Sequence, residues 1–570
     1  MKNFEIKHLY TKEGEKLKNG GTLSYDTAYP RPQMVRDSFF SLNGEWDFSA
    51  NGGEWEKITV PFPPESLLSG ICRSVGNQSF LQYRKRFTLP DGFKKDRVLL
   101  HLGAVDQHAA IKINGEYVGS HEDGYLPFHL DVTAHLTEGE NELEIMAVDD
   151  MTDRSLPYGK QRFDRGGMWY TPVSGIWQSV WLESVPERYI RSLKITPTAV
   201  GAVIEAEGVT DGNVTVSTPA GEEYFSLKDG KVTVNPRNIR YWSPDDPYLY
   251  RFTLKSGKDE IKSYFAIRTV ETKTVNGIPK ICLNGQPIFL HALLDQGYYS
   301  DGIYTPASPE CYEQDILMAK RLGFNTLRKH IKVESEWFYY YCDLHGIIVM
   351  QDMVNNGSYS FIRDTALPTV FMKSFPDKLL NRDKRVRENF LRHMKDTVKA
   401  LYNHPCICYW TIFNEGWGQF DSESAYALLK TVDPTRVTDT ASGWFHPKKS
   451  DVESIHTYFK PFKLKKGKSL PTVLSEFGGY SCKIAENSVN LENTYGYKSF
   501  DTPEDFESAL VSLYENEIIP AVENGLCGAV LTQITDVEDE VNGLITYDRK
   551  RVKVSEEKML SIAKKLYCTR

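Results

Sequence analysis

Short runs in which apolar and polar residues alternate dominate the first part of the chain. From about residue 36 to 185 they recur between turn residues, as in 98–102, 110–113 and 142–148, and a period of two is the pattern of a half-buried strand. Asn114-Gly115 separates two such runs, and this dipeptide favours a type I′ hairpin turn, whose two central residues need positive φ. Many short strands with frequent turns predict a β-sandwich of the jelly-roll type over residues 1–185.

The pattern then changes twice. Residues 186–272 form a second alternating block, of the length and pattern of a small immunoglobulin-like sandwich. From 273 to 570, helical stretches separate eight apolar runs, at 288–290, 325–328, 347–350, 407–413, 436–439, 452–456, 472–475 and 528–532. Eight buried strands with intervening helices predict a (β/α)8 barrel. A doubly wound sheet is the alternative, but no Gly-rich phosphate-binding motif follows any run.

Composition narrows the class of protein. With 41% hydrophobic and 25% charged residues, the 570-residue chain is typical of globular proteins. No stretch approaches the ~20 apolar residues of a membrane helix, and a net charge of −8 without clustered Lys and Arg argues against nucleic acid as a partner. The first ten residues lack the apolar segment of a secretory signal, so a cytoplasmic location is expected. Nine cysteines without a ligand spacing predict reduced thiols, and no metal or cofactor.

The candidate catalytic and binding residues lie at the carboxyl ends of the barrel strands, where active sites of this fold are found. Two glutamates, Glu415 and Glu476, follow the fourth and seventh runs, and a carboxylate pair across a barrel mouth suits glycoside hydrolysis, in which one group protonates the leaving oxygen and the other attacks. The alternative is that each glutamate is a solvated loop residue. The other candidates at the strand ends are His291, Asp295, Arg328, His330, Asp352, Asn414, Tyr458 and Gln533, with Trp444 as an aromatic surface for a sugar face.

Several segments resemble a known family. Asn414-Glu415 follows Tyr409-Trp410-Thr411-Ile412-Phe413, and the stretches at 103–106, 174–183, 323–328 and 475–478 recur in the corresponding domains of glycoside hydrolase family 2, which includes β-galactosidases, β-glucuronidases and β-mannosidases. The resemblance implies that Glu415 is the general acid/base and Glu476 the nucleophile. It further implies that Asn414 holds the sugar 2-hydroxyl, that Tyr458 lies near the nucleophile and that Arg328 keeps it ionised. His330 and Asp352 would line the pocket, although Asp352 is equally expected as a structural cap.

Two departures from the family bear on the substrate. Gln533 stands near the place where many members have a tryptophan, and Asn542 is not followed two residues later by the lysine with which β-glucuronidases read a carboxylate. The resemblance therefore implies an exo-acting retaining β-glycosidase with a galactoside as the first substrate. A uronidase or arabinosidase is the alternative within the family, and a non-catalytic carbohydrate-binding protein the alternative outside it. Lys160 and the loop 293–304 are expected to reach the sugar, and a homo-oligomer is expected by analogy.

Overall fold

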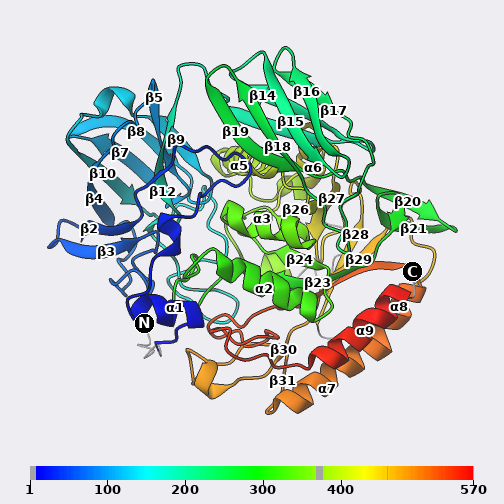
Figure 1. Cartoon of the computed structure of the whole chain (residues 1–570). Coiled ribbons are helices and arrows are strands. Elements are labelled where there is room, and N and C mark those ends of the chain that lie inside the picture. The colour runs from blue at the N-terminus through cyan, green and yellow to red at the C-terminus, as the bar shows by residue number, and fades with distance from the viewer. Residues whose placement is uncertain (1–7, 367–376, 459, 569–570) are drawn as a thin grey trace.

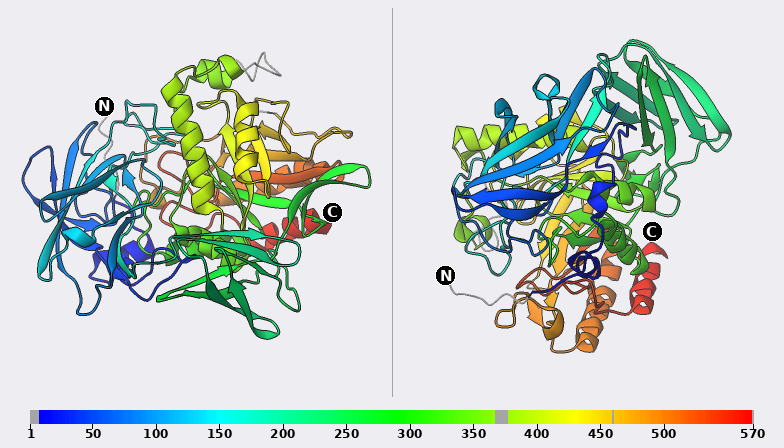
Figure 2. Two further views of the ribbon diagram at one scale, coloured as in Figure 1. Left: turned by 90° about the horizontal axis from the view of Figure 1, so that it is seen from above. Right: turned by 60° about the vertical axis from the view of Figure 1, so that its left-hand side comes forward.

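The computed structural model describes residues 8–366, 377–458 and 460–568 (Figure 1). Two β-sandwiches lie against a larger α/β barrel, and each of the three parts has its own cluster of buried apolar side chains. The barrel cluster also takes in residues of the first sandwich, among them Tyr125 and Trp177. Two further views show the first sandwich, coloured blue to cyan, beside the barrel, and the second sandwich packed on another side (Figure 2). The chain therefore forms one body in which the first sandwich borders the barrel.

The first sandwich consists of a four-stranded and a six-stranded antiparallel sheet. Strands of the six-stranded sheet alternate buried and accessible residues, so this sheet buries one face, whereas the central strands of the four-stranded sheet are buried on both faces. In sheet order the strands are β1 (Phe40–Ser41), β12 (Val180–Val185), β5 (Arg97–Leu102) and β9 (Phe128–Asp131), then β3 (Glu56–Val60), β2 (Gly44–Ala50), β4 (Phe80–Thr88), β10 (Glu140–Val148), β7 (His108–Ile113) and β8 (Glu116–Glu122). Asn114 and Gly115 join β7 to β8 with φ of 52° and 81°, which confirms the predicted hairpin.

The second sandwich packs a three-stranded sheet on a four-stranded one. Its strands are β13 (Ser192–Pro197), β14 (Ala202–Glu207) and β17 (Lys231–Val234), then β16 (Gly221–Leu227), β15 (Gly212–Thr218), β18 (Tyr250–Ser256) and β19 (Asp259–Phe265). A small sheet follows and leads into the barrel, made of β20 (Val270–Val275), β21 (Ile278–Leu283) and β22 (Gln286–Pro287). This matches the immunoglobulin-like block expected from the alternation.

The barrel contains eight parallel strands, all of them predicted from the apolar runs. In sheet order they are β27 (Val437–Ser442), β26 (Ile407–Asn414), β25 (Ile348–Asp352), β24 (Thr326–Lys329), β23 (Leu290–Asp295), β32 (Leu526–Thr532), β29 (Thr472–Gly478) and β28 (Glu453–Thr457). Because the first strand pairs with both the second and the last, the sheet curls into a barrel, which rules out a doubly wound sheet. β27 and β28, at the two ends of the strand order, share no ladder among the described residues.

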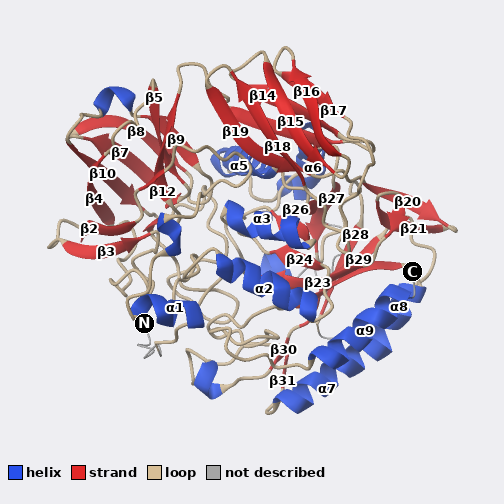
Figure 3. Ribbon diagram, viewed as in Figure 1, coloured by secondary structure: helices blue, strands red, loops and turns tan. Residues whose placement is uncertain are grey.

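Helices cover the barrel from outside, as the colouring by secondary structure shows (Figure 3). They are α2 (Glu310–Arg321), α3 (Glu336–His345), α5 (Lys384–Leu401), α6 (Ser422–Val432), α7 (Pro503–Leu513), α8 (Ile519–Glu523) and α9 (Glu556–Cys568). Shorter elements are α1 (Lys12–Lys18), the strand pairs β6 (Val105–Asp106) with β11 (Gly175–Ile176) and β30 (Tyr480–Ser481) with β31 (Lys498–Ser499), and 3-10 or π segments at 24–26, 133–135, 361–366, 377–379, 485–487 and 514–518.

The cysteines and the helices bear on two further expectations from composition. All nine cysteines are free thiols, seven of them buried, as their spacing predicted. Within the described part of the chain, no helix has the length and apolar character needed to cross a membrane.

Candidate active site

The turn after β26 presents Glu415 at the barrel mouth. Glu415 takes a left-handed conformation with φ of 49°, and its N–H donates to the Ser442 carbonyl 3.0 Å away on β27. Such a conformation costs a non-glycine residue ~1–3 kcal/mol and persists only where the surroundings impose it. The strain and the hydrogen bond together turn the side chain inward from the strand end, where it is only 9% exposed.

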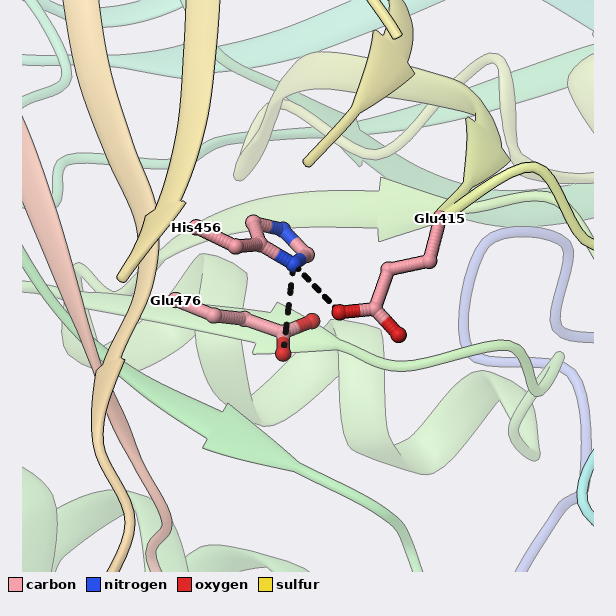
Figure 4. Close-up of side chains that lie close together, drawn as sticks. All are labelled: Glu415, His456 and Glu476. Atoms are coloured by element: carbon pink, nitrogen blue, oxygen red, sulfur yellow. Dashed lines mark hydrogen bonds and ion pairs between the residues drawn. The ribbon is translucent and has the colours of Figure 1, made fainter. Parts of the chain in front are cut away.

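A shift in strand register places the second glutamate opposite. β28 and β29 slip between Ile455 and His456, so that His456 becomes the neighbour of Glu476. His456 Nδ1 lies 2.8 Å from Glu415 Oε1 and 3.5 Å from Glu476 Oε2, and Figure 4 shows its ring between the two carboxylates. The three ligand atoms lie within 4.8 Å of one another. The structure thus brings the two predicted glutamates together.

Arg328, on β24, ties the strand ends together. It is fully buried, and all five of its N–H donors are used. Nη1 donates to Glu476 Oε1 at 3.0 Å and to the Ser475 carbonyl at 2.9 Å. Nη2 donates to Asn414 Oδ1 at 2.9 Å and Ser442 Oγ at 3.0 Å, and Nε donates to Asp352 Oδ1 at 3.0 Å. Arg328 therefore fixes the nucleophile candidate and the Asn414 amide in one network, and the Asn414 Nδ2 has no hydrogen bond to any residue that the structure describes.

The surroundings of Glu476 favour its ionised form. Burial alone would raise the pKa of this carboxyl, but the neighbouring His456, Arg328 and His330 and a hydrogen bond from Tyr458 lower the pKa to about 2. Tyr458 Oη lies 2.5 Å from Glu476 Oε2, and its ring stacks on Tyr497 with centroids 3.8 Å apart. A buried carboxylate that stays ionised at neutral pH has the charge state that a nucleophile requires.

Asp352 and His330 form a supporting pair. The Asp352 carboxylate accepts from Arg328 with one oxygen and lies 2.7 Å from His330 Nδ1 with the other, so both oxygens are used within the protein. Burial, together with the charge of Lys160, lowers the pKa of His330 to about 4. A neutral His330 that holds its proton on Nδ1 presents Nε2 as an acceptor. Asp352 thus has the contacts of a structural residue, which was one of the two roles expected for it. His330 is the residue of this pair that can accept a hydrogen bond from a sugar hydroxyl.

Two predicted residues lie elsewhere. The sequence pattern placed His291 just beyond the first strand, but β23 begins at Leu290, so His291 is its second residue and sits at the opposite end of the barrel. Both its nitrogens are engaged there, 3.0 Å from the Gly323 carbonyl and 3.0 Å from Tyr514 Oη. Asp295 pairs with Lys329 at 2.7 Å and accepts from the Gly297 N–H. The prediction that His291 binds substrate is therefore wrong, and both carboxylate oxygens of Asp295 have partners within the protein.

Several buried polar atoms around the glutamates have no partner among the described residues. They are His456 Nε2, Trp417 Nε1, Trp444 Nε1 and Gln533 Oε1. Trp444 packs edge-on to His456 at 5.7 Å, and the Gln533 Nε2 donates to Asn542 Oδ1 at 2.8 Å. Burying a polar group without a hydrogen bond costs ~1–3 kcal/mol. A cluster of such groups beside paired carboxylates indicates a ligand with several hydroxyls.

A long loop of the first sandwich, residues 149–174, lies across the strand ends. Tyr158 donates from its N–H to the Asn355 carbonyl at 3.1 Å and from Oη to the Gly357 carbonyl at 2.9 Å, both in the loop that follows β25. The Thr171 N–H donates to Glu538 Oε1 at 2.9 Å, in the loop that follows β32. This loop carries Lys160, which is 7% exposed. The first sandwich therefore contributes to the barrel mouth, whereas the loop 293–304 packs against that sandwich through Tyr304, whose Oη lies 3.0 Å from Tyr125 Oη.

The same glutamates and His456 form the one group of His, Cys, Asp or Glu among the described residues with the spacing of a metal site. The donor set does not fit a cation well. Arg328 already donates to Glu476 at 3.0 Å, and His456 Nδ1 is hydrogen-bonded to Glu415 at 2.8 Å. A dication there would face a buried guanidinium and would have to displace both contacts. The arrangement suits a proton between the carboxylates better than a metal ion.

Sequence reasoning missed residues that complete the site. His456 and Thr532 stand at the ends of the predicted runs 452–456 and 528–532 but were not among the candidates, and Ser442 and Tyr497 were not identified. Ser442 Oγ donates to Asn414 Oδ1 at 2.7 Å, and Thr532 Oγ1 lies 3.0 Å from Tyr458 Oη. The signal available for His456 was its place at the end of a predicted run, two residues before Tyr458, because residues two apart in extended chain point to the same side. Tyr497 comes from a distant loop and carried no such signal.

An eight-stranded parallel barrel with two inward-facing glutamates at its carboxyl mouth, flanked by two β-sandwiches, defines a multidomain hydrolase of the glycosidase type. Three family models match in the same order: "Glycosyl hydrolase 2 galactose-binding domain-like" at 54–162, "Glycosyl hydrolases family 2" at 190–268 and "Glycosyl hydrolases family 2, TIM barrel domain" at 280–517. Together they span most of the chain. The chain belongs to glycoside hydrolase family 2.

The sequence identity between this chain and similar proteins is low. A β-galactosidase of Thermoanaerobacter pseudethanolicus is 24% identical over 67% of this chain, which spans 51% of that protein. A β-glucuronidase of Paenibacillus borealis is 23% identical over 83% of each chain. Among solved structures, a β-D-glucuronidase of Dictyoglomus thermophilum has a TM-score of 0.72 at 17% identity, covering 94% of this chain and 98% of that one. A β-galacturonidase of Eisenbergiella tayi has a TM-score of 0.68 at 19% identity, covering 95% and 99%. The structural likeness shows the fold.

Proposed function

We propose that the protein is an exo-acting, retaining β-glycosidase that works by double displacement. Glu476 attacks the anomeric carbon while Glu415 protonates the leaving oxygen, and a glycosyl-enzyme forms. Glu415 then takes a proton from water, which releases the sugar with its configuration retained. The observation that carries the proposal is the carboxylate pair itself: both glutamates reach one histidine nitrogen, and their oxygens lie within 4.8 Å of it and of each other. Retaining enzymes place their carboxyl groups ~5–5.5 Å apart and inverting ones ~6.5–9.5 Å.

Other features support this assignment. The pKa of about 2 for Glu476 supplies an ionised nucleophile. The sandwich loop that crosses the strand ends, held by Tyr158 on the loop after β25, suits an enzyme that takes one terminal sugar. The named relatives include β-galactosidases and β-glucuronidases. A β-galactoside is the first candidate substrate, and a uronide is the second because of the charge carried by Lys160.

The experiment uses 4-nitrophenyl β-glycosides with two variants. Glu476→Ala should lose turnover, and added azide should restore it by direct attack, giving the α-glycosyl azide. Glu415→Ala should lose about 10²–10⁴-fold, because water must attack the glycosyl-enzyme without its general base, and azide should trap this glycosyl-enzyme as the β-glycosyl azide. Glu492→Ala, an exposed glutamate outside the site, should behave as wild type. If sugars bind but no glycoside is turned over, the protein is a carbohydrate-binding protein and the proposal is wrong.

A further inference from the structure

The connection from β28 to β29 covers the barrel wall without a helix. In a (β/α)8 barrel a helix normally follows each strand and packs over the outside of the sheet. The described residues between these two strands contain no helix. Within the connecting segment 460–471, Phe462 and Leu464 are buried, and the residues on either side of Leu464 are exposed lysines. An extended segment buries only alternate side chains in this way, so it fills less space against the strands than a helix would.

A cavity of about 340 Å³ lies between this segment and the outer side of the barrel wall; we call it the outer cavity. Leu474 and Phe477 of β29 line it and are fully buried. The Phe477 ring packs edge-on to Tyr514, which lies on the helical side of the wall, whereas the adjacent Glu476 contacts Arg328 inside the barrel. The outer cavity and the two glutamates are therefore on opposite faces of the wall. The other apolar side chains that line it are Phe462, Leu513 and Ile518.

The charged residues of the outer cavity make its rim positive. Lys460 and Lys498 line it and are exposed, and the Nζ of Lys498 lies 5.5 Å from the ring centroid of Tyr480, which also lines it. Glu517 is the one carboxylate among the described lining residues, and its Oε2 accepts from the Phe462 N–H at 2.6 Å. Two ammonium groups and one carboxylate give a net charge of +1, on a chain whose total is −8. An apolar floor with a few charged groups at the rim is typical of small-molecule sites, whose volumes are ~300–1,000 Å³.

One end of the outer cavity is formed by the ring pair that also contacts the nucleophile candidate. Tyr458 and Tyr497 line the cavity, and their rings stack with centroids 3.8 Å apart. The hydroxyl of Tyr458 donates to Glu476 Oε2 at 2.5 Å. Gly479, with φ of 60°, lets the backbone pack against this pair, because a Cβ there would clash with the Tyr497 ring. A ligand in the cavity would support the two rings from the side away from Glu476.

We infer that the outer cavity is a second ligand site, which takes a small organic monoanion with an aromatic body, and that its occupancy raises turnover by holding Tyr458 against Glu476. The aromatic body would fill the apolar floor, and the anionic group would meet Lys460 and Lys498 at the rim, where the charges are complementary. Binding at this site is independent of the proposed glycosidase function. Only the effect on turnover rests on that function.

Isothermal titration calorimetry on the full-length protein tests the site with 2-naphthoate and its neutral analogue 2-naphthamide. Naphthoate should bind about 10-fold more tightly than naphthamide. Lys460→Met and Lys498→Met should each weaken naphthoate binding by about 3- to 10-fold, because each removes one exposed charge that faces the anion, and should leave naphthamide binding unchanged. Lys466→Met, an exposed lysine of the same segment that does not line the cavity, should change neither. Failure of naphthoate to bind, equal affinity for the two probes, or equal losses in all three variants would overturn the inference.

Turnover measurements distinguish a second site from the sugar site. Saturating naphthoate should raise kcat/KM for a 4-nitrophenyl β-glycoside by about two- to fivefold in wild type, as a modest coupling between two sites would. In Lys460→Met and Lys498→Met the same rise should require a higher naphthoate concentration, whereas kcat/KM without naphthoate should match wild type. Competitive inhibition by naphthoate would place the anion among the sugar-binding residues and overturn the inference, and binding without any change in kcat/KM would overturn the coupling. If no glycoside is turned over, the proposed function fails, and calorimetry still decides whether the outer cavity binds the anion.

Discussion

The hydroxyl of Tyr458 offers a direct test of how the nucleophile is kept ionised. Tyr458→Phe removes the 2.5 Å hydrogen bond to Glu476 Oε2 and the 3.0 Å contact with Thr532 Oγ1. It preserves the ring, which stacks on Tyr497 at an interplanar angle of 10°. A hydrogen bond to a charged group contributes ~1.5–3 kcal/mol. At 1.36 kcal/mol per pKa unit, the pKa of Glu476 should rise from about 2 by ~1–2 units.

The sign of the pH effect follows from the role of Glu476. The nucleophile acts when ionised, so activity is lost as pH falls through its pKa, and a raised pKa moves this loss to higher pH. The acid limb of kcat/KM for an activated aryl β-glycoside should therefore shift upward by ~1–2 units in Tyr458→Phe. Profiles from pH 3 to 8, with Tm measured at each pH to exclude unfolding, provide the assay. A uniform fall in kcat/KM with an unmoved acid limb would refute the reasoning.

Two further perturbations test the contacts around the site. His456→Asn removes the nitrogen 2.8 Å from Glu415 Oε1. Because His456 positions the proton donor, kcat should fall by about tenfold for a glycoside with a poor leaving group but by less for an activated one. Steady-state kinetics on two aryl glycosides measures this, and equal losses would contradict it. Glu334→Gln leaves Lys329 and Lys332 without the carboxylate that they share. The free energy of unfolding, measured by denaturant titration, should fall by ~3–5 kcal/mol. An unchanged midpoint would show that these buried ion pairs do not stabilise the rim.

The strands of all three domains could be predicted because their apolar periodicity is local. Errors occurred where a boundary decided which residue faced the mouth. Placing the first barrel strand at 288–290 instead of Leu290–Asp295 moved His291 to the wrong end of the barrel. The polar His291 interrupts the apolar sequence and marked a false strand end, whereas the true strand is fixed by pairing with β24 and β32, which are distant in the sequence. Helix α1 was not expected, since its seven residues carry too little periodicity.

The site was predictable only where a motif or a strand end carried the residue. Glu415, Glu476, Asn414 and Arg328 were found in this way, and the structure groups them. The environment of Lys160 could not be predicted from the sequence, because it depends on how the loop of the sandwich crosses the barrel. The ion pair of Asp295 with Lys329 was equally hidden, since it forms only between the ends of neighbouring strands in the folded barrel. Motifs identify candidate catalytic residues, whereas tertiary contacts decide which charged side chains are already paired within the protein.

The open seam of the barrel gives the side-chain network a particular role. β27 and β28 share no ladder in the part of the chain that the structure describes, yet Glu415 is held by the β27 backbone through Ser442 and Glu476 lies on β29, on the other side of the seam. Side-chain contacts reach across it: His456 on β28 contacts Glu415, and Arg328 joins Ser442 to Glu476 from inside the barrel. The distance between the two carboxylates is therefore set by side chains and not by a strand ladder. Loss of either contact should loosen the spacing of the glutamates before it unfolds the barrel, which is why kcat and the free energy of unfolding are expected to respond separately.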